Sequence, residues 1–196
     1  MDFTIQEYKN RLHKVQQSMQ KKGIELLISQ DTANIYYLTG YDAWSFYYSQ
    51  CVIIHVNADE PICYVRAQDA GGALIKTYLK KENIVIYPEK YIHTWPNHPY
   101  DGLVELIKTK KWDKLNIGLE MDSHYFTAFC YEKLRQGLPN ANLKDSERLV
   151  NWVRCIKSET EITYMKNAAV ISEKAMKTAM EVINPGVRQC DAVAEI

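Results

Sequence analysis

The feature that most constrains the fold of this chain is the alternation of short apolar runs with longer segments of helical periodicity. Apolar runs bounded by turn residues are typical of buried strands, whereas apolar residues spaced by three and four are typical of covering helices. The predicted strands are 24–29, 46–56, 62–65, 84–87, 115–119 and 141–145. The predicted helices are 3–22, 68–79, 100–110 and 123–135, with a short one between Asp31 and Gly40. A hairpin followed by alternating helices and strands predicts an α/β fold in which helices cover a mixed β-sheet.

A long helix is predicted near the C-terminal end of the chain. Ser158 and Glu161 have the spacing of a capping box, which satisfies two backbone N–H groups at a helix start. Apolar residues then recur at helical spacing as far as Ile183, and the Pro-Gly pair at 185–186 ends the helix. The helix spans roughly 26 residues, or about 39 Å. Its apolar stripe requires a partner surface, because isolated helices owe most of their stability to packing. We expect one domain at 1–150 and a second structural unit at 151–196.

The composition excludes several classes of partner. Lys plus Arg and Asp plus Glu both number 24, so the formal net charge is zero and a nucleic-acid partner is not expected. The sequence shows neither an N-terminal leader nor an apolar run that could cross a bilayer, so we expect a cytoplasmic protein with no membrane partner. The five cysteines form no C-x-x-C pair, which argues against a zinc site of that type. Gly71-Gly72 lacks the surroundings of a phosphate-binding loop and is interpreted as a place where a helix packs closely on the sheet.

Two segments carry a resemblance to a known family. RCIKSETEITYMKNAA at 154–169, followed by NPGV at 184–187, resembles the junction of the creatinase, prolidase and aminopeptidase P family. NIYYLTGY at 34–41 is similar to a signature in that family's N-terminal domain. Three further stretches, 41–51, 61–73 and His98-Pro99, look most like the ectoine hydrolase branch. The chain departs from the family at Arg188, where relatives often carry a capping Ser or Thr, so that Asp191 gives only weaker support to the next helix.

The resemblance implies a fold and a function. The fold would be the ribonuclease H-like N-terminal domain of an M24-type metallohydrolase, followed by the first helices of a truncated pita-bread catalytic domain. The parent enzyme would hydrolyse a C–N bond with two divalent metal ions (Mn, Co or Zn), held by two Asp, one His and two Glu of the catalytic domain. We assign no catalytic residue and no metal ligand to this chain, and we expect it to be inactive alone. It would shape substrate access and dimerisation in a homodimer. The alternative is a stand-alone binding or oligomerisation module.

The resemblance also points to candidate substrate-binding residues, which would lie at a neighbouring subunit's active site. They are Trp44, Phe46, Tyr48 and His98. The aromatic run 44–48 is equally interpretable as a strand whose rings pack in the core. Tyr48 stands where creatinase-like relatives place an arginine that meets a substrate carboxylate. The loop 93–99 carries two histidines and is the best metal candidate, although we favour an ordered loop whose imidazoles make hydrogen bonds.

Overall fold

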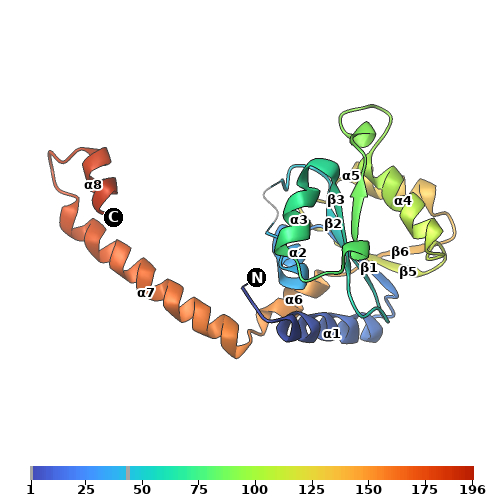
Figure 1. Cartoon of the computed structure of the whole chain (residues 1–196), viewed down its shortest axis with the longest axis horizontal. Helices are drawn as coiled ribbons and strands as arrows, with labels where there is room; N and C mark the ends of the chain where they lie inside the picture. Colours follow the sequence, from blue (N-terminus) through green and yellow to red (C-terminus); the bar gives the residue numbers. More distant parts are fainter. Residues whose placement is uncertain (1, 43–44) are drawn as a thin grey trace. The chain divides into compact units, whose positions relative to one another are not determined.

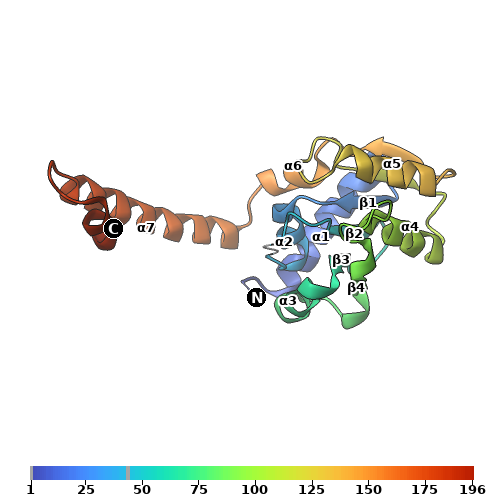
Figure 2. The same ribbon diagram turned by 90° about the horizontal axis from the view of Figure 1, so that it is seen from above.

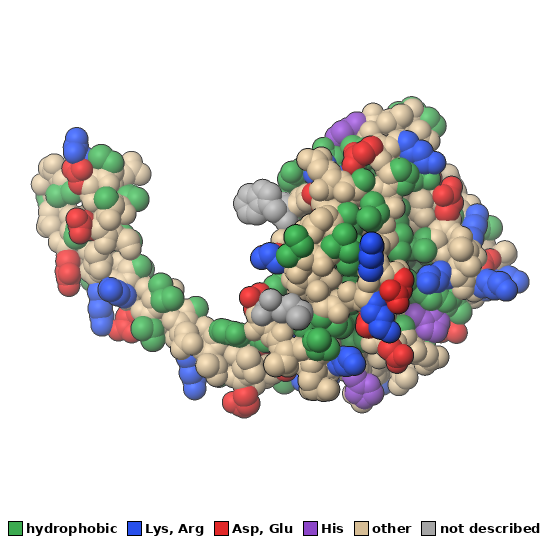
Figure 3. Space-filling view, viewed as in Figure 1, with side chains coloured by type: hydrophobic (Ala, Val, Ile, Leu, Met, Phe, Trp, Pro, Cys, Tyr) green, Lys and Arg blue, Asp and Glu red, His purple; other side chains and the backbone are tan. Residues whose placement is uncertain are grey.

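The computed structural model of the chain describes residues 2–42 and 45–196. The chain divides into two compact units, Met1–Cys155 and Ile156–Ile196, and each is described by itself. None of the helices in the described part of the chain has the length and hydropathy needed to cross a bilayer. In the first unit, acidic and basic side chains are intermixed over the face that Figure 3 shows, in keeping with the neutral composition.

The first unit is built on a six-stranded mixed sheet. The strands are β1 (Leu26–Ser29), β2 (Cys51–His55), β3 (Ile62–Arg66), β4 (Ile84–Tyr87), β5 (Asn116–Leu119) and β6 (Asn142–Asp145). Their order in the sheet is β4-β3-β2-β1-β5-β6. β2 pairs antiparallel with both β1 and β3, whereas the pairs β1–β5, β3–β4 and β5–β6 are parallel. The predicted mixed sheet and its β2–β3 hairpin are confirmed.

Helices cover both faces of this sheet (Figures 1 and 2). The helices of the first unit are α1 (Ile5–Lys21), α2 (Thr32–Thr39), α3 (Ala70–Lys76), α4 (Pro99–Thr109), α5 (Ala128–Gly137) and α6 (Leu149–Cys155). Short 3-10 helices lie at η1 (Ala67–Asp69), η2 (Lys81–Asn83) and η3 (Glu89–Tyr91). α1, α2, α3 and α6 share one buried apolar cluster with the sheet, and α4 and α5 share a second cluster on its other face. The first unit is therefore a three-layer α/β/α structure.

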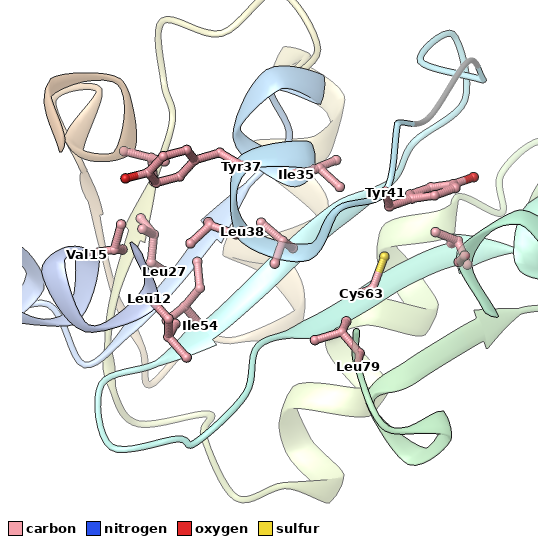
Figure 4. Close-up of a cluster of buried hydrophobic side chains, with 14 of the residues drawn as sticks. Leu12, Val15, Leu27, Ile35, Tyr37, Leu38, Tyr41, Ile54, Cys63 and Leu79 are labelled. Atoms are coloured by element: carbon pink, nitrogen blue, oxygen red, sulfur yellow. The ribbon is translucent and has the colours of Figure 1, made fainter. Parts of the chain in front are cut away.

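The strands contribute to the two clusters alternately, because successive side chains of a strand point to opposite faces. Leu27 belongs to the first cluster, whereas Leu26 and Ile28 on the same strand belong to the second. Figure 4 shows the first cluster, where Leu38 of α2 lies over Leu27 and Ile54 of the sheet. All of these side chains are fully buried. The continuous apolar runs in the sequence are thus explained by burial on both faces.

The predicted strand 46–56 is wrong in its first half. β2 begins only at Cys51, and Tyr48 N–H donates to Ser45 O at 3.0 Å in a turn before it. The extent of the two adjacent strands explains this limit. Val52 pairs with the last residue of β1, and Cys51 is the first residue that pairs with β3. Residues 46–50 therefore have no strand on either side with which to form a ladder.

Two predicted helices are shorter than expected, and one helix was not predicted. The segment 68–79 forms η1 and then α3, which ends at Lys76. In the segment 123–135, helix begins only at Ala128, because the side chain of Thr127 caps it by accepting from Cys130 N at 3.3 Å. α6 arises from a segment without clear periodicity, and its Val150 is buried in the first cluster.

Glycine allows close packing at a different position from the one predicted. A Cβ at Gly71 would meet nothing within 4 Å, so the interpretation of the Gly71-Gly72 pair as a close-packing site is wrong for Gly71. At Gly72, a Cβ would be in ordinary contact with Tyr41 at 3.5 Å. In α4, by contrast, a Cβ at Gly102 would lie 2.5 Å from the Tyr64 hydroxyl oxygen.

The second unit consists of α7 (Glu159–Val182) and α8 (Gln189–Glu195). The predicted capping box is present: Ser158 Oγ accepts from Glu161 N at 3.2 Å, and Glu161 Oε2 accepts from Ser158 N at 2.8 Å. Arg188 precedes α8 without a side-chain cap, as expected, and its guanidinium pairs with Asp191 at 2.8 Å. Many apolar side chains of α7 are exposed, among them Ile171 and Met180.

Candidate functional site

The candidate site is a cavity of about 450 Å³ on the first unit, which we call the aromatic pocket. Its walls come from the turn before β2, the segment between η3 and α4, and α5. The lining residues are Tyr47, Tyr48, Ser49, Tyr91, Ile92, His93, Thr94, Trp95, Asn97, His98, Pro99 and Phe129. Most of them are aromatic or apolar, and a few offer hydrogen-bonding groups. Such a lining is typical of a site for a small organic molecule.

Tyr48 forms one wall and is held from behind by Arg66. The Arg66 guanidinium lies 3.8 Å from the centroid of the Tyr48 ring, a cation–π contact. Arg66 is itself fixed at the end of β3 by Asp69, at 2.6 Å between Nε and Oδ2, and this pairing raises the pKa of Arg66. The turn is tied to β4 because the Tyr87 hydroxyl donates to Ser49 O at 2.7 Å. The wall is therefore rigid although it lies outside the sheet ladder.

His98 forms a second wall and is the N-cap of α4. Its Nδ1 accepts from Tyr100 N at 3.2 Å, and Asp101 Oδ2 accepts from His98 N at 2.8 Å. Asp101 also pairs with Lys133 of α5 at 2.9 Å, which joins the start of α4 to α5. Burial lowers the pKa of His98 from its ordinary value of 6.5; the charge of Asp101 opposes this shift and that of Lys133 adds to it. The imidazole is therefore neutral near pH 7.

The third wall is a stack of rings. Trp95 stacks on Phe129 of α5 with ring centroids 5.4 Å apart and an angle of 19° between the planes. The rings of Phe129 and His98 also meet edge to face, with centroids 5.1 Å apart and 81° between the planes. Trp95 is 80% exposed, so one face of its ring is open to a ligand or partner.

The structure brings together two of the four predicted site residues. Tyr48 and His98 both line the aromatic pocket. Phe46 is on the same turn but outside the lining; it is 45% exposed and packs against Tyr125 with ring centroids 6.0 Å apart. Trp44 lies outside the described residues.

Sequence reasoning missed Trp95 and Phe129 as pocket residues. Trp95 lies inside the loop 93–99, which the sequence singled out only for its histidines. No local signal identifies Phe129, because its position in the pocket depends on the packing of α5 beside this loop. The described residues contain no group of three or more His, Cys, Asp or Glu placed to hold a metal ion.

A second, smaller cavity of about 130 Å³ is polar, and its lining includes Asp31, Asp122 and Arg148. At its base, Glu120 accepts from Ser29 Oγ at 2.6 Å and from Asn34 Nδ2 at 2.6 Å. Burial raises the pKa of Glu120, while these hydrogen bonds partly oppose the shift. Asn34 in turn accepts from Arg154 Nη1 at 2.8 Å. This network fastens α6 to the core and is a structural feature.

Comparison with known proteins identifies the relatives of this chain. Residues 11–156 match the family described as Creatinase/Prolidase N-terminal domain. Over its whole length the chain is 43% identical to the uncharacterized hydrolase/peptidase y4tM of Sinorhizobium fredii, of which it covers 50%. It is 41% identical over its whole length to the ectoine hydrolase of Halomonas elongata, of which it covers 49%. The chain thus spans about half the length of the curated relatives it matches.

Solved structures show the same fold. The crystal structure of a prolidase from Thermococcus sibiricus superposes with a TM-score of 0.72 at 19% identity, over 96% of this chain and 48% of that one. Likeness at this level of identity concerns the fold alone. The six-stranded sheet and its covering helices are therefore shared with proteins of very different sequence.

Proposed function

This chain belongs to the creatinase/prolidase N-terminal domain family, and from that premise we propose that it is the non-catalytic N-terminal part of a metal-dependent hydrolase. One observation carries the proposal: the chain aligns along its whole length with about half of a hydrolase/peptidase and of an ectoine hydrolase. Residues 1–150 then form the family domain, and 151–196 form the junction and the first helices of the catalytic half.

The parent reaction in this proposal is hydrolysis of a C–N bond in a small molecule. The substrate classes are an Xaa-Pro dipeptide and a cyclic or guanidino compound of the ectoine or creatine kind. The chemistry that two divalent metal ions (Mn, Co or Zn) would supply, when bound in the catalytic half, is activation of the attacking water and polarisation of the bond to be cleaved. Their ligands, two Asp, one His and two Glu, belong to the catalytic half. In this proposal the contribution of the present chain is binding and orientation.

In this proposal the aromatic pocket, including the turn before β2, faces the substrate entrance. Tyr48 and His98 line the pocket, and Phe46 lies on the same turn as Tyr48. Aromatic side chains suit this role, because they offer large rigid area with few rotatable bonds. In a homodimer these residues wall the active site of the neighbouring subunit.

The first test is to sequence the gene beyond codon 196. We expect an open reading frame that supplies Asp, Asp, His, Glu and Glu in that order. An authentic stop codon would instead favour the competing function, a stand-alone binding or oligomerisation module. If the 196-residue chain alone hydrolysed ectoine or an Xaa-Pro dipeptide with added Mn or Co, in proportion to its concentration, the non-catalytic role would be wrong.

The second test measures hydrolysis by the longer protein. Tyr48→Ala should raise KM for the true substrate about 5- to 30-fold, because the loss of one buried aromatic contact weakens binding by about 1–2 kcal/mol. Ile75→Ala is the matched control, since Ile75 is 82% exposed on α3 and lies outside the pocket lining. Equal KM values for the two variants would contradict a substrate-facing pocket.

A further inference from the structure

The two ring nitrogens of His98 have different surroundings. The lone pair of Nδ1 accepts a hydrogen bond from Tyr100 N at 3.2 Å, so this nitrogen carries no proton. In a neutral imidazole the proton must then be on Nε2. The tautomer is therefore fixed by the capping of α4. Among the described residues, Nε2 has no hydrogen-bond partner, although the ring lines the aromatic pocket.

Capping alone does not require a histidine. Asn, Asp, Ser and Thr are the residues that usually accept this hydrogen bond at a helix start. An imidazole adds to the cap a second polar atom, the Nε2–H group, and a flat ring that packs against Phe129 and Tyr100 with centroids 5.1 and 5.6 Å apart. The additional atom is a hydrogen-bond donor on a residue that lines a pocket rich in aromatic surface.

The lining of the aromatic pocket is compatible with an acceptor group on its ligand. No Asp or Glu is present among the described residues that line it. Two cations lie against rings of the lining: Arg66 at 3.8 Å from the Tyr48 centroid and Lys133 at 5.3 Å from the Phe129 centroid. Both cations are paired, Arg66 with Asp69 and Lys133 with Asp101, so they leave no net positive charge beside the pocket. A carboxylate in the pocket would meet no acidic side chain of the lining.

We infer that His98 is a specificity-determining hydrogen-bond donor whose Nε2–H recognises a carboxylate or carbonyl oxygen of a small molecule in the aromatic pocket. The apolar or ring portion of the same molecule packs against Tyr48 and Phe129. This inference deepens the proposed function and rests on it in taking the pocket as the substrate-facing site.

Two isosteric variants separate the donor from the cap. His98→Asn keeps an acceptor near the position of Nδ1 and loses the Nε2–H group, whereas His98→Gln places an amide N–H near the position of Nε2 and loses the cap. Binding of ectoine and of glycyl-proline to the 196-residue chain is measured by NMR titration, with pyrrolidine as a probe that has no acceptor oxygen. Thermal unfolding of both variants monitors their folding.

The donor role predicts a definite pattern. The two oxygen-bearing probes bind the wild-type chain at millimolar concentration or below and shift resonances of Tyr48 and Phe129, whereas pyrrolidine does not. His98→Asn weakens binding about tenfold or more, since a hydrogen bond to a charged group is lost, and His98→Gln stays within about threefold of wild type. Loss in His98→Gln but not in His98→Asn, equal affinities in all three proteins, or absence of binding by both oxygen-bearing probes would overturn the inference.

The tautomer has its own readout. The ¹⁵N shifts of the His98 ring at pH 7 should place Nδ1 in the range of an unprotonated nitrogen and Nε2 in the range of a protonated one. The reverse assignment would overturn the inference whatever the binding results. Neither measurement uses hydrolysis, so an inactive parent with these results in place would contradict only the proposed function. An active parent with the opposite results would contradict only the role of His98.

Discussion

Replacing Gly102 by alanine should destabilise the first unit, although alanine favours helix more than glycine. Gly102 lies in α4, where a Cβ would be 2.5 Å from the Tyr64 hydroxyl oxygen and 3.0 Å from Tyr91 Cε2. The Tyr64 side chain cannot move without losing packing and a hydrogen bond, because it is 2% exposed and its hydroxyl donates to Pro99 O at 2.7 Å. The new methyl group must therefore displace a buried ring or the helix itself.

The size of the effect follows from three contributions. Helix propensity favours alanine by about 1 kcal/mol. Overpacking of a filled core costs about 1–3 kcal/mol. Displacing the Tyr64 hydroxyl from Pro99 O leaves buried polar groups unsatisfied, which costs about a further 1–3 kcal/mol. The net loss in the free energy of unfolding is between about 1 and 5 kcal/mol.

Urea denaturation with linear extrapolation measures this loss. The matched control is Gly71→Ala in α3, where a Cβ meets nothing within 4 Å and the same substitution should stabilise by about 0.5–1 kcal/mol. Tyr64→Phe removes the oxygen nearest to the new methyl group, so Gly102→Ala should cost less in that background. A Gly102→Ala variant as stable as wild type, or a shift of the same sign in both glycine variants, would refute the packing argument.

Three further predictions concern pH, capping and association. Because burial lowers the pKa of His98 below 6.5, the unfolded chain binds a proton that the folded chain does not as pH falls through this range. The contribution of His98 to stability is thus present above pH 6.5 and lost below it, so the free energy of unfolding should fall more from about pH 7.5 to about pH 5 in wild type than in His98→Asn. Equal slopes would contradict it. Ser158→Ala should lower the local stability of the first turn of α7 by about 1 kcal/mol, seen as faster hydrogen exchange at Glu161 N, whereas Ser172→Ala in the middle of the same helix should leave that rate unchanged. The exposed apolar side chains of α7, with Ile171 at 71% and Met180 at 77%, should promote self-association in sedimentation experiments. A version ending at Lys157 should then be monomeric, and identical profiles would count against the prediction.

The candidate site was only partly predictable from the sequence. Tyr48 and His98 were predicted as substrate-binding residues through a family resemblance in their own segments. Both line the aromatic pocket, and their role in substrate binding stays a prediction. Phe129 was not identified, since it reaches the pocket only because α5 packs beside the loop before α4. The role of Arg66 was also hidden. Nothing near Arg66 in the sequence indicates that its guanidinium supports a ring eighteen residues earlier in the chain, at Tyr48.

Local sequence determined the kind and order of most elements. The capping box at Ser158 and Glu161 and the apolar strands follow from residues within a few positions of one another, because propensity, periodicity and caps act over one or two turns. The mixed character of the sheet follows from the order of the elements, a hairpin and then alternating helices and strands. Only the tertiary structure decided where β2 begins, which glycine packs closely and which nitrogen of His98 carries the proton. Strand limits and close packing depend on neighbours distant in the chain, and the proton on His98 depends on whether the loop before α4 adopts the cap geometry.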